Sequence, residues 1–416
     1  METYQTRAAR IMQRINTLAG ISEDAHGVTR TFGTAAFLAG RDLVQTWMEA
    51  AGLAVRTDGI GNLRARLVSQ NPQAKTFVLA SHIDTVVNAG KFDGPLGVLL
   101  GLDLLETLVK QQVNLPFHVE LIAFSDEEGV RFHTTYLGSK VVAGSFDRSL
   151  LEKKDAAGIS LAQAIAAMGG NTQSLANEAI ASHDWLGYFE AHIEQGPVLY
   201  ERNIPVALVT AIAGQQRVEL TWQGMAGHAG TVPMDMRQDA LAGAAEFVLA
   251  AEQFALARKT EVVATVGKLG VSNSASNVIP GEVTCSLDLR SADAGQLAAA
   301  YEALREQAEA IAHRRNLGLS WNLIQQTAPV ACDAEMNKLL AEAIAASGYE
   351  VVSLVSGAGH DAVPISAVSP ATMLFIRCFK GISHNPLEDV ELDDLAAALA
   401  VADRFLTLLF TQFQTH

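Results

Sequence analysis

A histidine and two aspartates lie where an apolar segment ends and a helical one begins. The stretch Ser81-His82-Ile83-Asp84-Thr85 follows a buried-strand pattern at 76–80, and Asp93 precedes a helical pattern at 95–110. Imidazole nitrogen and carboxylate oxygen are donors that suit zinc or manganese, and ligand sites of open α/β sheets form where strands end. Asp84 is placed to accept the second imidazole N–H of His82 and so to fix its tautomer. The stretch therefore predicts part of a metal site.

Further histidines and carboxylates follow other apolar runs in the same way. They are Glu127-Glu128, His192 and His384. A lone buried histidine is more often a core residue than a ligand, and a Glu-Glu pair in a loop is usually solvated. Together, however, these residues supply three histidines and two or three carboxylates at one sheet edge if the strands are parallel. That set suits two divalent ions that share one carboxylate.

The elements that must position these residues alternate between strands and helices, which indicates an α/β fold with a mostly parallel sheet. Apolar spacing predicts helices at 4–17, 35–51, 95–110, 136–143, 334–347 and 391–411, and strands at 76–80, 117–124, about 188–192, 350–354 and 371–377. Residues 53–58 and 62–67 alternate like a hairpin. We therefore expect a discontinuous catalytic domain formed by residues 1–212 and 330–416.

The pattern changes at Gly214, where an inserted segment begins. Its predicted elements are strand 217–222, helix 233–256, strands 261–269 and 282–289, helix 293–314 with Ser291 and Asp293 as candidate N-caps, and strand 317–324. The order β-α-β-β-α-β is that of a ferredoxin-like unit. Residues 213–329 are therefore predicted to form a second, inserted domain.

Composition argues against several classes of function. The chain has 416 residues, 49% of them apolar and 18% charged, which is typical of a globular soluble protein with two domains. Its net charge of −15 argues against nucleic acid or an anionic membrane as a partner. Three scattered cysteines, a start unlike a signal peptide and no membrane-length apolar run predict a cytoplasmic protein.

Six motifs together resemble the hydantoinase/carbamoylase family of amidohydrolases, within the superfamily of dinuclear-metal aminoacylases and exopeptidases. The motifs are Ser81–Thr85, Asp126–Gly129, His192–Leu199, Gly227–Met234, Ser356–Ala362 and Gly381–Pro386. The resemblance extends over both domains, from about residue 30 to residue 400. These motifs are specific for the family and less specific for its substrate.

The resemblance implies two divalent ions per chain, zinc or manganese, with cobalt and nickel also suitable. The implied ligands are Asp93 as the bridge, His82 and His192 on one ion, and Glu128 and His384 on the other. Glu127 matches the general base, which takes a proton from the attacking water and returns it to the leaving nitrogen. Asp84 matches the partner of His82 behind the metal.

In the inserted domain, the resemblance implies residues that hold substrate. They are Arg217, Asn277 and Arg290. Arginine can hold a carboxylate through two hydrogen bonds, although Arg290 can equally be read as a surface charge at a strand end. His228 lies between glycines and matches a residue that reaches the other subunit of a homodimer, built through the inserted domain, to stabilise an oxyanion; the alternative is a solvent-facing histidine. Gln195 and His360 are expected to line the site.

The implied reaction is hydrolysis of the carbamoyl C–N bond of an N-carbamoyl-L-amino acid, giving the amino acid, ammonia and carbon dioxide. Allantoate is the second candidate substrate and N-carbamoyl-β-alanine the third. An aminoacylase or dipeptidase on the same scaffold is a further alternative, against which His192 and Arg217 argue. A non-catalytic protein would be indicated by loss of Glu127 or a ligand, and none is lost. A mononuclear iron oxygenase would leave Glu127, Asp93 and His384 without roles.

Overall fold

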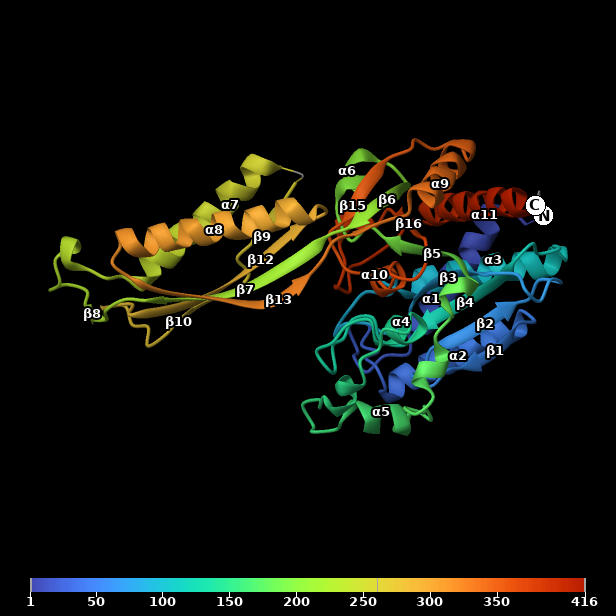
Figure 1. The fold of residues 1–416 in the computed structure, drawn as a ribbon, viewed down its shortest axis with the longest axis horizontal. Helices are drawn as coiled ribbons and strands as arrows, with labels where there is room; N and C mark the ends of the chain where they lie inside the picture. Colours follow the sequence, from blue (N-terminus) through green and yellow to red (C-terminus); the bar gives the residue numbers. More distant parts are fainter. Residues whose placement is uncertain (1, 260, 415–416) are drawn as a thin grey trace. The chain divides into compact units, whose positions relative to one another are not determined.

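The structure is a computed structural model that describes residues 2–259 and 261–414, and it divides into two compact units (Figure 1). The first unit contains the chain up to Thr210 and again from Cys332 onward, and the second contains Ala211–Ala331. Each unit has its own hydrophobic core. The two are described separately below.

The first unit is built on a mixed sheet whose centre is parallel. The strand order is β1 (Ala54–Thr57), β2 (Leu63–Leu67), β4 (His118–Phe124), β3 (Thr76–His82), β5 (Trp185–Ile193), β16 (Ala371–Ile376) and β6 (Val206–Ile212). The four strands β4, β3, β5 and β16 run parallel to one another, and β1, β2 and β6 pair antiparallel at the edges. The predicted α/β fold with a mainly parallel central sheet is confirmed.

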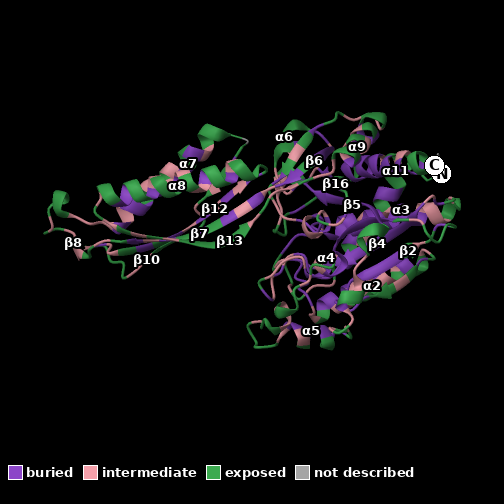
Figure 2. Ribbon diagram, viewed as in Figure 1, coloured by how far each residue is buried: buried purple, intermediate pink, exposed green. Residues whose placement is uncertain are grey.

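The central strands are apolar along their whole length because both faces of the sheet are covered. Every residue of β3, β4, β5 and β16 is buried (Figure 2). The covering helices are α1 (Tyr4–Ala19), α2 (Ala35–Ala50), α3 (Pro95–Gln111), α4 (Leu137–Val142), α9 (Ala334–Ala346), α10 (Ala362–Ile365) and α11 (Leu392–Gln414). Helix α3 packs directly on β5: a Cβ added at Gly97 would lie 2.2 Å from the Ala191 carbonyl oxygen. Parallel strands buried on both faces are expected to be continuously hydrophobic.

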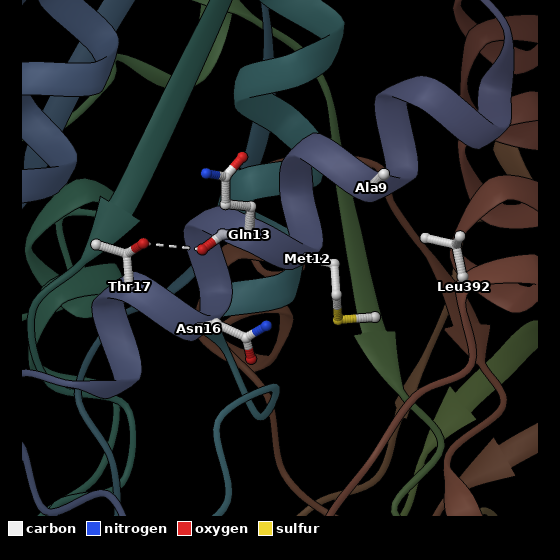
Figure 3. Close-up of a pocket in the computed structure, with 6 residues that line it drawn as sticks. All are labelled: Ala9, Met12, Gln13, Asn16, Thr17 and Leu392. Carbon is white, nitrogen blue, oxygen red and sulfur yellow. Dashed lines mark hydrogen bonds between the residues drawn. The ribbon is translucent and has the colours of Figure 1, made fainter.

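Shorter elements complete the first unit. They are α5 (Leu161–Ala167), α6 (Val198–Arg202), β15 (Ser353–Ser356), which pairs with β6, and 3₁₀ turns at Arg148–Glu152, Leu175–Glu178, Ser182–Asp184 and Phe379–Gly381. A surface pocket beside α1 is lined by Ala9, Met12, Gln13, Asn16, Thr17 and Leu392 (Figure 3). Its lining has no histidine, cysteine or carboxylate, so it cannot supply the chemistry predicted above.

The second unit packs two helices on one face of an antiparallel sheet. Its strands are ordered β10 (Leu269–Val271), β12 (Glu282–Ser291), β7 (Gly214–Gln223) and β13 (Gly318–Thr327), and β9 (Val263–Thr265) also pairs with β12. The helices α7 (Ala240–Arg258) and α8 (Ala294–Arg314) share a core with the buried face of β7 and β12. The alternating burial of β7 and β12 leaves polar side chains on the other face. Val330–Ala331 forms β14, which pairs with the end of β6.

Several element predictions differ from the structure, and the strand expected at 350–354 is found as β15 at Ser353–Ser356. The helix expected at 233–256 starts at Ala240, because Asp239 caps it by accepting from the Leu241 and Ala242 backbone N–H groups. The strand expected at 261–269 is two short strands, β9 and β10. Strand β6 had no predicted counterpart, although Val206–Ile212 is apolar.

Helix α7 is the one described helix that is long and apolar enough to cross a membrane. It nevertheless packs Phe247 and Phe254 into the core of the second unit. Packing of this kind is ordinary for a core helix, so its composition alone is weak support for a membrane span.

Candidate metal centre

The ends of four adjacent parallel strands, and the loops that follow them, bring the predicted ligands to one edge of the sheet. His82 is the last residue of β3, Glu127 and Glu128 follow β4, His192 is the second-last residue of β5, and His384 follows β16. The strands are hydrogen-bonded in the order β4, β3, β5, β16. Because the carboxyl ends of parallel strands meet at one edge, residues more than three hundred positions apart become neighbours.

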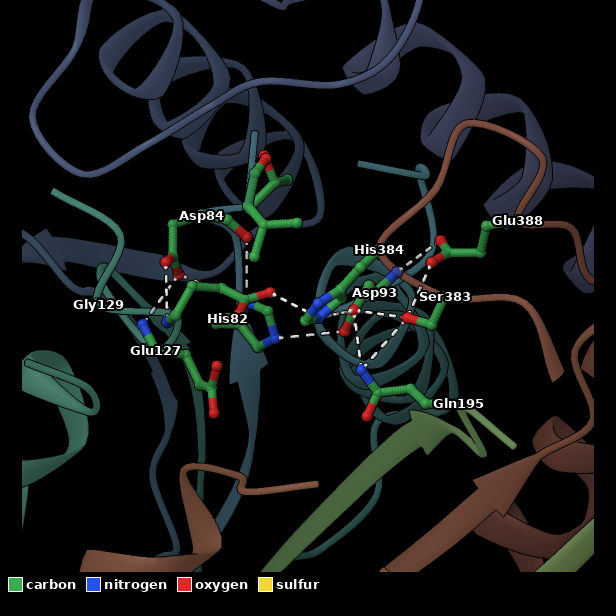
Figure 4. A network of polar contacts seen from close by, with 12 residues as sticks. His82, Asp84, Asp93, Glu127, Gly129, Gln195, Ser383, His384 and Glu388 are labelled. Carbon is green, nitrogen blue, oxygen red and sulfur yellow. Dashed lines mark hydrogen bonds and ion pairs between the residues drawn. The ribbon is translucent and has the colours of Figure 1, made fainter. Parts of the chain in front are cut away.

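Asp93 lies at the middle of this cluster, and its two oxygens face different histidines. Oδ1 is 3.0 Å from His192 Nε2 and 3.8 Å from His82 Nε2. Oδ2 is 3.1 Å from His384 Nε2 (Figure 4). The same nitrogen is 3.4 Å from Glu128 Oε1. A carboxylate that faces two donor sets through separate oxygens has the geometry of a bridging ligand.

The atoms are close enough to share cations. Three groups have ligand atoms that all lie within 4.8 Å of one another: His82, Asp93 and His192; Asp93, Glu128 and His384; and His82, Glu127 and Glu128. Two ligands about 2.1 Å from one tetrahedral zinc lie about 3.4 Å apart. The first two groups contain the residues expected as the two ligand sets, and each of them could hold a divalent cation.

Backbone carbonyls orient both buried imidazoles. The Nδ1 of His82 is 3.0 Å from the Asp84 carbonyl oxygen, and that of His192 is 2.9 Å from the Ile193 carbonyl oxygen. Each ring therefore donates its Nδ1–H to a carbonyl oxygen and turns Nε2 toward Asp93. The Asp84 carboxylate was expected to accept from His82, but its Oδ1 is farther away, at 3.4 Å.

The Asp84 carboxylate instead holds the loop that carries the two glutamates. Its Oδ1 accepts from the Glu127 backbone N–H at 3.0 Å, and its Oδ2 accepts from the Glu128 backbone N–H at 3.1 Å. Asp84 is 1% exposed, so both bonds are sheltered from water. The aspartate thus fixes the candidate base and a candidate ligand relative to the end of β3.

Burial and neighbouring charges shift the titration of the cluster. Burial, with repulsion from Glu128, raises the pKa of Glu127 well above its usual value, which suits a group that must gain a proton. Burial would also raise the pKa of Asp93, but hydrogen bonds from His192 and His384 outweigh it and hold that pKa well below normal. The hydrogen bonds of His384 to Asp93 and Glu128 raise its pKa to about 10.

Unusual backbone conformations occur at this edge. Gly94 has φ of +84°, and a Cβ there would lie 2.4 Å from His82 Cε1. Gln195 and His384 adopt φ of +57° and +54°, a region that non-glycine residues enter at a cost. Such strain is typical of functional sites.

Gln195 and His360 both lie beside the cluster, in different ways. The Gln195 amide donates to Asp93 Oδ2 at 2.9 Å, so it contacts the candidate bridge. His360 is 1% exposed, with its ring centroid 4.5 Å from that of His192. Its Nε2 is 2.7 Å from Ser356 Oγ, and burial together with His192 lowers its pKa well below normal. His360 is therefore neutral and packed behind a candidate ligand.

Within the second unit, the structure groups the predicted substrate residues in two places. Arg217 on β7 and Arg290 on β12 both bind Asp288, with Nε to carboxylate distances of 3.1 and 2.9 Å. His228 pairs with Val278 in the ribbon formed by β8 (Gly227–His228) and β11 (Val278–Ile279), which brings it beside Asn277. The Gly230 backbone N–H donates to His228 Nδ1 at 3.0 Å, so neutral His228 carries its proton on Nε2.

Three residues that contact the predicted site residues, in one unit or the other, were not themselves predicted. They are Asp288, Ser383 and Glu388. Asp288 had a signal, because residues two apart on a strand share a face and it lies two before Arg290. Ser383 and Glu388 lie in the His384 loop, but their bonds to Asp93 join positions nearly three hundred residues apart. Nothing local in the sequence marks such bonds.

The chain is similar to known proteins along most of its length. Peptidase family M20/M25/M40 matches residues 78–408. The N-carbamoyl-L-amino acid amidohydrolase of Geobacillus stearothermophilus is 39% identical over 94% of this chain and 96% of that protein. Allantoate deiminase 1 of Glycine max is 37% identical over 92% and 86%. The crystal structure of a hydantoinase/carbamoylase family amidase from Burkholderia multivorans has a TM-score of 0.89 and 33% identity, covering 96% of this chain and 97% of that one.

Proposed function

The chain belongs to peptidase family M20/M25/M40, and from this premise we propose that it hydrolyses the carbamoyl C–N bond of an N-carbamoyl-L-amino acid. The products are the amino acid, ammonia and carbon dioxide. The observation that carries the proposal is Asp93, whose two oxygens face two separate donor sets. Relatives with 33–39% identity over most of the chain are named N-carbamoyl-L-amino acid amidohydrolases.

The family is metal-dependent, and the cluster supplies ligands for two divalent cations. We assign His82, Asp93 and His192 to one ion, and Asp93, Glu128 and His384 to the other. Imidazole and carboxylate ligands suit zinc or manganese, and also cobalt or nickel. Bound there, the cations supply Lewis-acid activation of water and of the substrate carbonyl.

Glu127 acts as the general base in this proposal. Its carboxylate takes a proton from the water that attacks the carbamoyl carbon, and it later gives that proton to the leaving nitrogen. The raised pKa of Glu127, caused by burial and Glu128, favours its holding the proton between these steps. Asp84 keeps the loop in place through the two backbone N–H groups that it accepts.

The inserted unit, in this proposal, is a ferredoxin-like lid that binds the substrate carboxylate. Arg217 and Arg290 lie on neighbouring strands and share Asp288. Two guanidinium groups on one face supply the directed donors that a carboxylate needs. Asn277 is exposed next to His228 and is assigned to a polar group of the substrate.

We further propose a homodimer formed through the inserted unit, in which His228 of one subunit serves the metal centre of the other. The side chain is exposed on a short ribbon, and its Nε2–H is the free donor because Gly230 bonds Nδ1. A donor of this kind stabilises the oxyanion that develops on the carbamoyl oxygen.

A cytoplasmic location, with no nucleic-acid or membrane partner, also stays a prediction.

Allantoate is the second candidate substrate, because several relatives are named allantoate deiminases. N-carbamoyl-β-alanine follows, and then the amides that an aminoacylase or dipeptidase would cleave. All of these present a C–N bond to the same proposed centre and differ in what the lid must hold.

A side-by-side substrate assay tests the proposal. The purified protein, loaded with manganese or zinc, is given N-carbamoyl-L-methionine, allantoate, N-carbamoyl-β-alanine, N-acetyl-L-methionine and a dipeptide, and kcat/KM is measured for each. We expect the first to be cleaved fastest and its D-enantiomer to be a poor substrate. Preference for allantoate would make allantoate the substrate and keep the enzyme within the ureido class. Activity on N-acetyl-L-methionine and the dipeptide alone would overturn the proposal.

A further inference from the structure

Glu388 is a buried carboxylate that contacts the candidate bridging ligand from behind. It is 2% exposed and lies four residues after His384. Its Oε1 accepts from the backbone N–H groups of Phe92 and Asp93, at 2.7 and 3.1 Å (Figure 4). One oxygen thus holds two successive amides of the loop that carries Asp93.

The other oxygen of Glu388 reaches the Asp93 side chain through a hydroxyl. Ser383 Oγ is 3.2 Å from Glu388 Oε2 and 2.9 Å from Asp93 Oδ2. The Gln195 amide donates to the same Asp93 oxygen at 2.9 Å and to Ser383 Oγ at 3.3 Å. Oδ2 is also the oxygen that faces His384. The chain Glu388, Ser383, Asp93 therefore joins the loops of two candidate ligands.

The packing around Glu388 leaves it little freedom. A Cβ added at Gly90 would lie 2.3 Å from Glu388 Cβ and 2.5 Å from its Oε1. The glycine therefore lets the 90–93 backbone lie directly against the glutamate. Among the described residues, the groups whose atoms could share a cation do not include Glu388. Its contacts are thus with the ligands and their loops.

We propose that Glu388 is a positioning residue that sets the metal affinity of the centre by locking Asp93 and the His384 loop together through Ser383. The inference rests on the proposed dinuclear centre and assigns Glu388 no direct contact with substrate. Partners that orient metal ligands typically change metal affinity by about 10- to 100-fold when they are lost. This role involves no proton transfer and no covalent bond.

Calorimetric titration of the metal-free protein with Mn²⁺ tests the inference without any substrate. Glu388→Ala removes all three contacts and should weaken Mn²⁺ binding by about 10- to 100-fold. Glu388→Gln should stay within about threefold of the parent protein, because its carbonyl oxygen can accept both amides and its NH₂ can donate to Ser383. Ser383→Ala is a smaller change, and its Mn²⁺ affinity should lie between those of the two Glu388 variants. It keeps the test available if Glu388→Ala does not fold.

The control is Asp333→Ala, which also removes a carboxylate that accepts a backbone N–H, that of Met336. Asp333 pairs with Ala371 at the start of β16, at the strand end opposite the cluster. It should lower stability and leave Mn²⁺ affinity unchanged. Parent-like affinity in folded Glu388→Ala and Ser383→Ala, or an equal loss in Glu388→Gln and Glu388→Ala, would overturn the inference. Failure of the parent protein itself to bind either Mn²⁺ or Zn²⁺ would instead refute the proposed centre.

Discussion

At the scale of single residues, Asp93 explains why the cluster has two halves. Each carboxylate oxygen faces its own histidines, and hydrogen bonds from Gln195 and Ser383 hold Oδ2 in place. Glu127 lies beside a candidate ligand and is bonded through its backbone to Asp84. This division of roles makes separate predictions for the ligands and for the base.

Glu127→Gln should retain both metal ions and lower kcat by about 10²- to 10⁴-fold, because the amide cannot take a proton from water. Metal content by atomic emission and kcat by ammonia release are measured on the same sample. Asp147→Asn, an exposed change at the start of a 3₁₀ turn, supplies the control. A fully active Glu127→Gln enzyme would mean that another group is the base.

Metal binding should release protons near neutral pH. The hydrogen bonds of His384 to Asp93 and Glu128 raise its pKa to about 10, so the metal-free protein carries a proton on His384 that a cation must displace. Since that proton is bound below pH 10, apparent metal affinity should rise as pH increases toward that value. Calorimetry in buffers of different ionisation enthalpy counts the protons. Release that is no smaller in His384→Ala would contradict the assignment.

Most of these residues could be predicted from the sequence, because each is a polar residue that follows an apolar strand. That pattern can be recognised from residue types alone. Two of the residues that it missed, Ser383 and Glu388, act through distant partners: Glu388 bonds the backbone of Phe92 and Asp93. Asp288 bonds Arg290 on its own strand and Arg217 on the neighbouring strand. A carboxylate in a loop has no local pattern that distinguishes such contacts from solvation.

At the scale of elements, helix α3 and strand β5 hold the candidate ligands at a fixed separation. Asp93 lies just before α3, and His192 lies near the end of β5. The two elements meet at Gly97, where any side chain would contact the Ala191 carbonyl oxygen. The packing of one helix on one strand therefore sets the spacing of two residues that share a proposed ion.

Gly97→Ala should destabilise the first unit by about 2 kcal/mol, since overpacking costs about 1–3 kcal/mol or more and the gain in helix propensity is at most about 1 kcal/mol. The Cβ would lie 2.2 Å from a backbone oxygen that cannot rotate away. Urea denaturation measures the free energy of unfolding. Gly357→Ala is the control, because its added Cβ would meet no atom within 4 Å apart from those of the adjacent residues. Equal stability of the two variants would show that α3 can shift freely.

Periodicity predicted the buried parallel strands because these are continuously apolar and end in polar loops. It missed β6, where Val206–Ile212 has the same apolar character but follows a short helix directly. It also placed the start of α7 too early, because the apolar spacing already begins at residue 233, before the Asp239 cap that starts the helix. Periodicity reports burial, whereas caps and edge pairing decide where elements begin.

At the scale of the whole molecule, the residues of the proposed reaction are divided between two units. The candidate metal-ligand cluster belongs to the first unit, and the arginines and His228 that we propose to hold substrate belong to the second. Catalysis by the proposed route requires both. The proposed homodimer adds that one subunit's His228 completes the centre of the other.

A mixed-dimer experiment tests that exchange. His228→Ala and Arg290→Ala should each be nearly inactive alone. A mixed dimer should regain up to about half of the activity of the parental dimer, because one of its two sites has both residues intact. Separately tagged chains isolate the mixed species, and ammonia release measures it. Absence of recovery in a confirmed mixed dimer would show that His228 serves its own chain.

The most direct test of the central claim is ammonia release from N-carbamoyl-L-methionine as metal-free protein is reloaded. We predict no turnover without metal, and activity that rises with added Mn²⁺ or Zn²⁺ until about two ions per chain are bound. Turnover by the metal-free protein, or full activity at one ion per chain, would contradict a dinuclear hydrolase built around Asp93.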